Sequence, residues 1–245
     1  MKTASLAHTE PTASKAEMSG TALFHSGGFD QRMSLRNMKY AFFLPGLAML
    51  GMLIACSSNN KPAEPEKPEV KPPDLVGGLS GFHKGFVTAR GWNADAQPYR
   101  IESVVTTDGG NGHDGKWAVW RSSFASPAAR ATKTYTWSGS NADGAPARGI
   151  SPGTEDSYSP SNASTHVFDP QFLKIDTDQA LETAKKHGGD KVLTASPDTP
   201  VTYVCDWNHN TNQLVWHVIF GSGREGAKLI VSVDASTGEF IRVEK

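Results

Sequence analysis

The sequence is poor in cysteine, and its charges form no cluster of one sign. Cys56 and Cys205 are the two cysteines among 245 residues, so the chain can form at most one internal disulfide. The formal net charge is −1 at pH 7, with neither sign gathered into a stripe. Because nucleic-acid binding usually requires a basic stripe, we expect no nucleic-acid partner. Hydrophobic residues make up 38% of the chain, which is enough for an ordinary core in one or two domains.

Motifs of a catalytic serine, a metal site or a cofactor site are also missing from the sequence. No G-x-S-x-G, Walker or G-x-G-x-x-G sequence stands in the context that each requires. The glycine-rich GGNGHDGK, residues 109–116, lacks the P-loop spacing, and we interpret it as a solvated turn between two strands. The histidines after Cys56 are scattered, without the spacing of an H-E-x-x-H zinc site: they are His83, His113, His166, His187, His209 and His217. We therefore expect no metal and no cofactor.

The apolar run Tyr40–Ala55 is short for a membrane span, which needs roughly 20 apolar residues, and Pro45 interrupts it. Met33 and Met38 each precede a basic residue and then this run. A positive segment, a short apolar segment and small residues before a cleavage point form the layout of a secretory signal. We predict a signal peptide over residues 33–55. A stop-transfer helix and a core helix with a buried cysteine are the alternatives.

The last residues of this run, Leu53-Ile54-Ala55-Cys56, resemble the bacterial lipobox. The resemblance implies cleavage after Ala55, a diacylglyceryl thioether on Cys56 and acylation of the new amino terminus. Two or more acyl chains, such as palmitate, hold a protein stably at a membrane, whereas one chain binds only marginally. We therefore predict a lipid-anchored protein of the bacterial cell envelope, with the membrane as a partner through Cys56. Cys205 would then be the single free thiol, so no internal disulfide is expected.

The segments on either side of the predicted signal lack the apolar periodicity of a folded domain. Residues 1–32 are rich in Ser, Thr, Ala and Gly, and we interpret them as disordered or as lying upstream of the true start. Residues 56–74 are a predicted tether, in which proline alternates with charges of both signs. At roughly 3.1 Å per residue its proline-rich part would span about 40 Å. Ser57 stands where an Asp would signal inner-membrane retention, so we expect the outer membrane, facing the periplasm.

The clearest periodicity lies in the C-terminal part of the chain. Asp176 and Gln179 form a capping pair for a helix that ends at Gly188-Gly189. The apolar stripe of this helix comprises Ala180, Leu181 and Ala184. Alternating apolar and polar residues then predict strands at 201–207, 214–220, 229–233 and 240–243. We expect one helix packed on an antiparallel sheet.

The order of these segments resembles a PepSY domain. The helix DTDQALETAKKHGG, the strands VTYVCDW and LVWHVIF, and the end LIVSVDASTGEFIRVEK are similar to that family, whose usual end is "VDA-x-TG-E" and a last strand. The resemblance covers residues 172–245. It implies a domain of the kind found in protease propeptides and cell-envelope proteins, where such domains are thought to restrain peptidases or mediate local contacts.

The first half of the chain echoes the second. Trp120 and Phe124 have the same spacing as Trp216 and Phe220, and each pair precedes another strand and a glycine. We place a first helix in TARGWNADAQ and a first strand in IESVVTTD. The predicted fold is therefore α+β, with two PepSY-like repeats, each a helix on an antiparallel sheet of about four strands. The boundaries are a first repeat at 75–140, a loop linker at 141–166 and a second repeat at 167–245. The tryptophans are predicted to be core residues, although Trp117, Trp137 and Trp207 fit either face.

The residues around Asp206 suggest two functional sites, a calcium loop and a thiol nucleophile with its base, but they match neither pattern fully. Asp206 to Asn212 place oxygen side chains at alternate positions, as in a calcium loop, but Thr211 stands where that loop needs glycine and His217 where it needs glutamate. We interpret this stretch as a polar hairpin turn. Cys205 with Asp206 and either His209 or His217 could form a thiol nucleophile and its base. Strand alternation, however, places Cys205 and His217 on opposite sides of their strands.

The function predicted from these patterns is a non-catalytic binding or peptidase-restraining module on the cell envelope, with an envelope protein or peptidase as its partner. The loop 139–165 and the open face of the sheet are the expected contact regions, because binding often uses loops on a rigid scaffold. Two alternatives stay open. One is an envelope hydrolase that uses the region from Asp206 to His217, and the other is a structural lipoprotein without a soluble partner.

Overall fold

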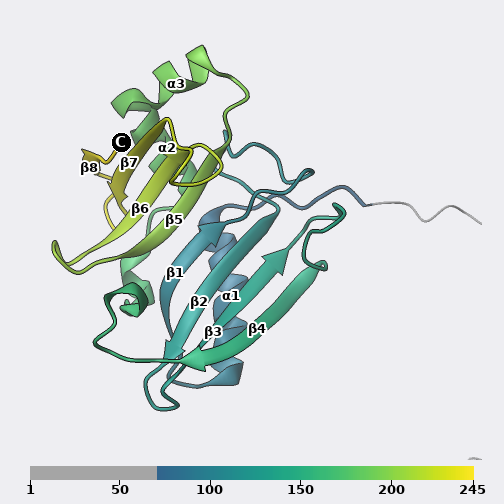
Figure 1. The fold of residues 1–245 in the computed structure, drawn as a ribbon, viewed down its shortest axis with the longest axis vertical. Helices are drawn as coiled ribbons and strands as arrows, with labels where there is room; N and C mark the ends of the chain where they lie inside the picture. The colour runs from purple at the N-terminus through teal and green to yellow at the C-terminus, as the bar shows by residue number, and fades with distance from the viewer. Residues whose placement is uncertain (1–70) are drawn as a thin grey trace, which may run out of the picture. The chain divides into compact units, whose positions relative to one another are not determined.

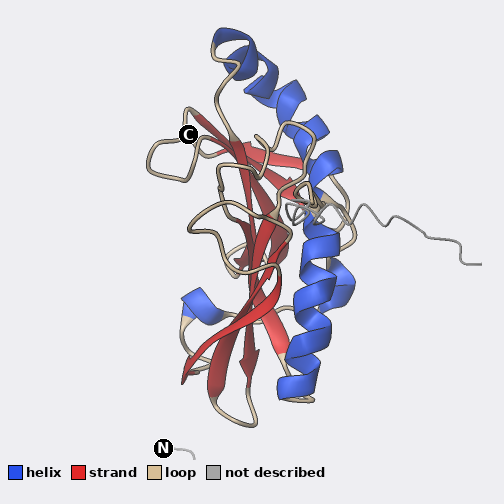
Figure 2. Ribbon diagram, turned by 90° about the vertical axis from the view of Figure 1, so that its right-hand side faces the viewer, coloured by secondary structure: helices blue, strands red, loops and turns tan. Residues whose placement is uncertain are grey.

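The computed structural model describes residues 71–245, which form one eight-stranded antiparallel sheet with its α-helices on one side of it (Figures 1 and 2). The predicted α+β class is therefore confirmed. The predictions for residues 1–32, for the signal peptide 33–55, for the cleavage site after Ala55 and for Cys56 all fall outside the described residues.

The chain runs through one helix, four strands, further helices and four more strands (Figure 1). The first group is α1 (Gly78–Trp92), β1 (Gln97–Ser103), β2 (Val119–Ser126), β3 (Ala131–Ser138) and β4 (Gly149–Ser157). The connection holds the 3-10 helices η1 (Ala163–Thr165) and η2 (Pro170–Phe172). The second group is α2 (Thr177–Ala184), the π-helical turn η3 (Lys185–Gly189), α3 (Asp190–Ala195), β5 (Val201–Asn208), β6 (Gln213–Phe220), β7 (Leu229–Asp234) and β8 (Phe240–Val243).

The first strand of each group lies at the centre of the sheet. The spatial order is β4-β3-β2-β1-β5-β6-β7-β8, and β1 pairs with β5 through three register positions, which join Arg100 to Asp206, Ile101 to Cys205 and Glu102 to Val204. Beyond these positions the two central strands part. The sheet is thus continuous across both groups, but its central junction is short.

The glycine-rich loop 109–116 fills the gap where the two central strands part. It joins β1 to β2, as predicted, but it is a solvated turn only in part, because Gly109, Gly112 and Gly115 are buried while residues 110, 111, 114 and 116 are exposed. The carbonyl of Asn111 accepts the N–H of Val201 at 2.8 Å, and the hydroxyl of Tyr203 donates to the carbonyl of Gly112 at 2.6 Å. The loop from the first group therefore completes the hydrogen bonding of a strand in the second.

The first helix lies further toward the N-terminus than predicted: α1 spans Gly78–Trp92, whereas the expected helix was in residues 88–97. Its sequence, GLSGFHKGFVTARGW, contains glycines that lower helix propensity and hide the periodicity. These glycines allow close packing on the sheet, because a side chain at Gly81 would collide with the ring of Trp120. Tertiary packing thus overrides a weak local preference for helix.

A second correction concerns the predicted loop linker 141–166, which contains strand β4 (Gly149–Ser157). This strand pairs with β3 at the edge of the sheet and is mostly exposed. Pro152 and Gly153 disguise it in the sequence, yet proline is tolerated on an edge strand, whose outer side needs no ladder hydrogen bond. The first group of strands therefore extends to residue 157.

The C-terminal predictions agree better with the structure. The capping box of Asp176 and Gln179 is present, and the predicted apolar stripe of α2 is buried. Strands β5 to β8 lie where the alternation placed them. The helical segment, however, does not end at the glycine pair: Gly188, with φ +114°, breaks the helix, and α3 follows.

Two tryptophans hold matching positions in the core between helices and sheet. Trp120 and Trp216 are both fully buried, as predicted. The indole N–H of Trp120 donates to the carbonyl of Val76 at 2.9 Å, just before α1. That of Trp216 donates to the carbonyl of Ile175 at 2.8 Å, just before α2. Each indole therefore fixes the approach to the helix in its own group of elements.

Candidate functional site

The side of the sheet opposite α1, α2 and α3 is covered by loops rather than by these helices (Figure 2), and we call it the open face. Strand register places one row of side chains across it. Arg121 on β2 lies opposite Glu102 on β1, which lies opposite Val204 on β5. The row continues from Val204 to His217 on β6 and then to Ser232 on β7. Residues far apart in the sequence thus form one polar surface.

Arginines lie above carboxylates in the first part of this row. Glu102 accepts hydrogen bonds from Arg121 Nη1 at 2.8 Å and from Arg100 Nε at 2.9 Å. Arg100 Nη1 also donates to Asp206 Oδ2 at 3.1 Å. The side chain of Arg121 is 46% exposed and that of Glu102 21%, so the solvent meets mainly guanidinium groups. The carboxylates beneath hold these groups in place.

His217 lies between two carboxylates in the second part of the row. Its Nε2 is 3.1 Å from Asp206 Oδ1, and its Nδ1 is 2.8 Å from Glu244 Oε1. Glu244 also accepts hydrogen bonds from the hydroxyl of Ser232 and from Arg224 Nη1. Because both ring nitrogens face acceptors, the protonated imidazolium satisfies both hydrogen bonds.

The electrostatics of this cluster favour its charged form. Burial lowers the pKa of His217, but the hydrogen bonds and charges of Asp206 and Glu244 together outweigh it, so the pKa is raised above its ordinary value. The hydrogen bond from His217, against the effect of burial and aided by Ser232 and Arg224, holds the pKa of Glu244 well below its usual range. Both shifts favour a protonated His217 beside an ionised Glu244, which form an ion pair in a partly buried cluster.

The predicted catalytic alternative fails on geometry at Cys205. Asp206 and His217 do meet, but Cys205 lies on the helix side of the sheet and is fully buried, so the prediction of opposite sides is confirmed. Burial, followed by the charge of Asp206, raises the pKa of its thiol well above the ordinary value. His209 is exposed in the turn between β5 and β6. Among residues 71–245, Ser232 supplies the only hydroxyl hydrogen-bonded in this cluster, and it donates to Glu244 rather than to His217.

The predicted hairpin turn at Asp206 to Asn212 is present, and its side chains serve the turn. Asn208 Oδ1 accepts the N–H of Asn210 at 3.1 Å, and Asn212 adopts a left-handed conformation with φ +54°. Within residues 71–245, no three His, Cys, Asp or Glu side chains are grouped so that they could hold a metal ion.

A cleft of about 380 Å³ lies on the open face beside the charged row. We call it the arginine cleft, and its lining comprises Arg100, Glu102, Ser103, Val104, Val105, Arg121, Thr202, Val204, Ile219, Ser222, Gly223 and Arg224. Sequence reasoning missed its three arginines. They come from β1, β2 and the loop after β6, and no local sequence pattern indicates that residues so far apart in the chain lie together.

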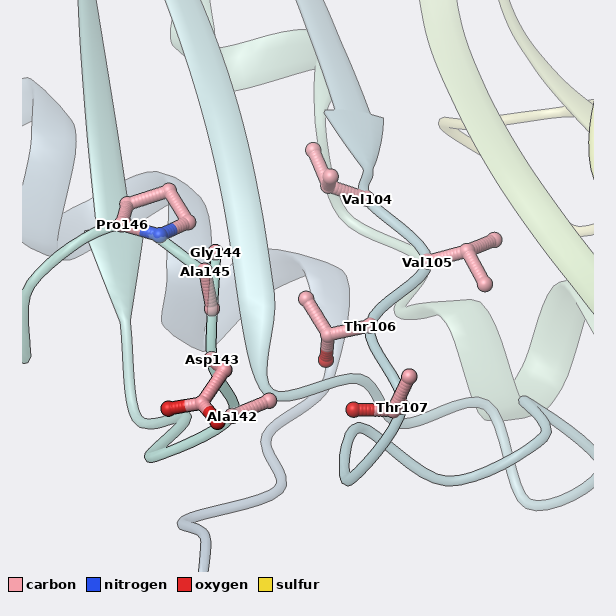
Figure 3. Close-up of a pocket in the computed structure, with 9 residues that line it drawn as sticks. All are labelled: Val104, Val105, Thr106, Thr107, Ala142, Asp143, Gly144, Ala145 and Pro146. Carbon is pink, nitrogen blue, oxygen red and sulfur yellow. The ribbon is translucent and has the colours of Figure 1, made fainter.

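A second hollow, of about 330 Å³, adjoins the cleft (Figure 3). Its two walls are residues 104–107, which follow β1, and residues 142–146 of the loop between β3 and β4. Val104 and Val105 line both hollows. Part of the loop 139–165, one of the two predicted contact regions, therefore lies next to the other, the open face.

Residues 71–74, the last part of the predicted tether, are held against this loop. Arg148 Nη2 lies 2.6 Å from the carboxylate of Asp74, and the N–H of Asp74 donates to the carbonyl of Gly139 at 3.0 Å. Asn141 Nδ2 donates to the carbonyl of Lys71 at 2.6 Å. Residues 71–74 are thus held at the loop between β3 and β4.

No protein-family model, curated protein or solved structure matches this chain. Among the helices of residues 71–245, none has the length and apolar character needed to cross a membrane.

Proposed function

We propose that this protein is a lipid-anchored envelope protein whose two PepSY-like repeats form a non-catalytic module that binds an envelope protein or restrains a peptidase. The proposed repeats are residues 75–157, which now include β4, and residues 167–245. Two features support their equivalence: four strands follow helical structure in each group, α1 in the first and α2 with α3 in the second, and Trp120 and Trp216 make the same hydrogen bond to the chain before α1 and α2.

The observation that carries binding rather than catalysis is the state of His217. Carboxylates face both of its ring nitrogens, so the imidazole has no free nitrogen to serve as a general base. Cys205, the thiol that would serve as a nucleophile, lies on the other side of the sheet. What the open face offers instead is a row of charges already oriented on a rigid sheet, which suits recognition of a partner.

The proposed anchor is the lipid on Cys56, and the proposed location is the outer membrane, facing the periplasm. Mass spectrometry of the protein from the native envelope tests this. A mature chain that begins at Cys56 and carries acyl chains is expected, and Cys56→Ser should release the protein from the membrane fraction. An unmodified Cys56, or a chain still carrying residues 33–55, would contradict the anchor.

Photo-crosslinking of the full chain in intact cells tests the binding function. A photoreactive residue at Thr136, which lies opposite Arg121 on the open face, is expected to form an adduct with an envelope protein or peptidase. The matched control is a photoreactive residue at Val87, which is 72% exposed on α1. An identified peptidase should then lose activity when the purified protein is added. Equal adducts from both positions, or none from Thr136, would count against the proposal.

A further inference from the structure

We infer that the arginine cleft binds an acidic peptide segment of a partner protein, with carboxylates on its arginines and an apolar side chain on its floor. This inference rests on the proposed binding function and names the ligand of that same surface. Its starting point is the juxtaposition of Arg100, Arg121 and Arg224 over the side chains of Val204 and Ile219.

The first argument is charge complementarity. The lining itself holds three arginines and one carboxylate, Glu102, a formal charge of +2, while the carboxylates of Asp206 and Glu244, which pair with Arg100 and Arg224, lie outside the lining. The side chains of Arg121 and Arg224 are 46% and 42% exposed, whereas that of Glu102 is 21% exposed. A ligand that enters the cleft therefore meets cations first.

The second argument is that these guanidinium groups are oriented in advance and retain donors. Within residues 71–245, Arg121 uses Nη1 for Glu102, and Arg224 uses Nη1 for Glu244. The Nη2 atoms make no hydrogen bond there and can donate to a ligand. A guanidinium fork matches the two oxygens of a carboxylate, and a group already held in position loses less freedom on binding.

The third argument is the apolar floor, which favours a peptide over a small free anion. Val204 and Ile219 belong to a small apolar cluster of the second strand group, together with Ala227 and Ile230. Val105 adds an apolar wall that is 44% exposed. The lining contains no aromatic side chain on which a nucleic-acid base could stack. A segment that alternates acidic and apolar residues matches both parts of the cleft.

The experiment is calorimetric titration of the full chain with two blocked hexapeptides, one alternating glutamate with valine and one alternating glutamine with valine. The glutamate peptide is expected to bind, and the glutamine peptide to bind about tenfold more weakly or not at all, since it lacks the charge-assisted hydrogen bonds. Raising the ionic strength from about 0.1 M to about 1 M, which shortens the Debye length from about 10 Å to about 3 Å, should weaken binding.

Three variants locate the site. Arg121→Gln with Arg224→Gln should lower the affinity about tenfold or more, the effect of losing two charge-assisted contacts. Val105→Asp should also lower it, through like-charge repulsion, and touches no ion pair of the open face. The control is Arg242→Gln, which removes an arginine that is 55% exposed on the same face but lies outside the cleft lining. It should bind as the wild type does.

The inference is overturned if the glutamate peptide does not bind, if all variants bind it equally, or if an oligonucleotide or anionic lipid vesicles compete for the cleft more strongly than the peptide. These results differ from a failure of the proposed function. If a partner is crosslinked but the glutamate peptide does not bind, the inference of an acidic ligand is wrong and the proposed binding function is retained. If the peptide binds at the cleft but no partner is crosslinked in cells, the proposed binding function is contradicted and the inference about the cleft is retained.

Discussion

The carboxylate of Asp176, which caps the N-terminus of α2, also accepts the backbone N–H of Leu79 near the start of α1, at 2.9 Å. The neighbouring hydroxyl of Thr177 accepts the N–H of Gly78 at 2.9 Å. The first turn of α1 has no side-chain cap from its own Gly77. Residues of the second group therefore supply the N-terminal cap of the first helix, which ties the two groups together at a second point besides the pairing of β1 with β5.

Asp176→Ala should remove acceptors from two helix N-termini at once. A single N-cap contributes about 1 kcal/mol, so we expect a loss of about 1–3 kcal/mol in the free energy of unfolding, measured by denaturant titration. Asp176→Asn is the matched control, because its amide oxygen can still accept, and it should cost clearly less. Equal losses for Ala and Asn would show that charge, rather than capping, stabilises this point.

Gly112 should tolerate a side chain far less well than Gly144, although both adopt left-handed backbone, with φ +75° and +79°. A Cβ at position 112 would collide with the carbonyl of Val201 and lie 2.6 Å from Trp117 Nε1, whereas nothing lies within 4 Å of one at position 144. Gly144→Ala should cost about 1–2 kcal/mol from conformation alone. Gly112→Ala should cost about 1–3 kcal/mol more, because it overpacks the junction between the strand groups. Similar unfolding free energies would contradict this role of the loop.

Trp216→Ala should lower the free energy of unfolding by about 3–5 kcal/mol, the range for deleting a large buried aromatic side chain. Trp216→Phe keeps most of the packing but leaves the carbonyl of Ile175 without its donor, so about 1–3 kcal/mol is expected. The control is Trp92→Phe, whose indole donates to Glu155 at an exposed site. It should cost less than about 1 kcal/mol. A loss below about 1 kcal/mol for Trp216→Ala would contradict its role in the core.

The stability contributed by His217 should depend on pH in a definite direction. Its pKa is raised in the folded state above the ordinary 6.5, so the contribution is fully present below pH 6.5 and is lost as pH rises through the folded-state pKa. Glu244 has a lowered pKa, so its contribution is present above its ordinary 4.5 and is lost in acid. The ion pair therefore stabilises most between about pH 4.5 and 6.5.

His217→Gln tests this pH dependence. The difference in unfolding free energy between wild type and variant should be largest near pH 6, about 1.5–3 kcal/mol for a charge-assisted hydrogen bond, and should shrink toward pH 9. His209→Gln, at an exposed turn, should show no such trend. A difference that grows with rising pH would mean that His217 is neutral in the folded protein.

Sequence periodicity was sufficient for the second strand group and insufficient for the first. Strands β5 and β6 alternate clearly because their helix-side residues fill a core, and the capping box at Asp176 is a local signal. The glycines of α1 serve contacts with distant aromatic rings, and Pro152 suits an edge position, so neither follows a local rule. The arginine cleft depends on strand order, which no single segment encodes. In contrast, the alternation of residues along the strands was enough to predict that Cys205 and His217 lie on opposite faces of the sheet.

The short pairing between β1 and β5 also determines whether fragments of this chain can remain soluble on their own. Separating the fragments between β4 and α2 would leave Ile101 and Cys205, both fully buried, along two bare strand edges. Exposed edges of that kind invite self-association. Heat or denaturant should therefore melt residues 71–245 in a single cooperative transition. Neither half is an interchangeable module, and truncated forms should be found in inclusion bodies rather than in solution.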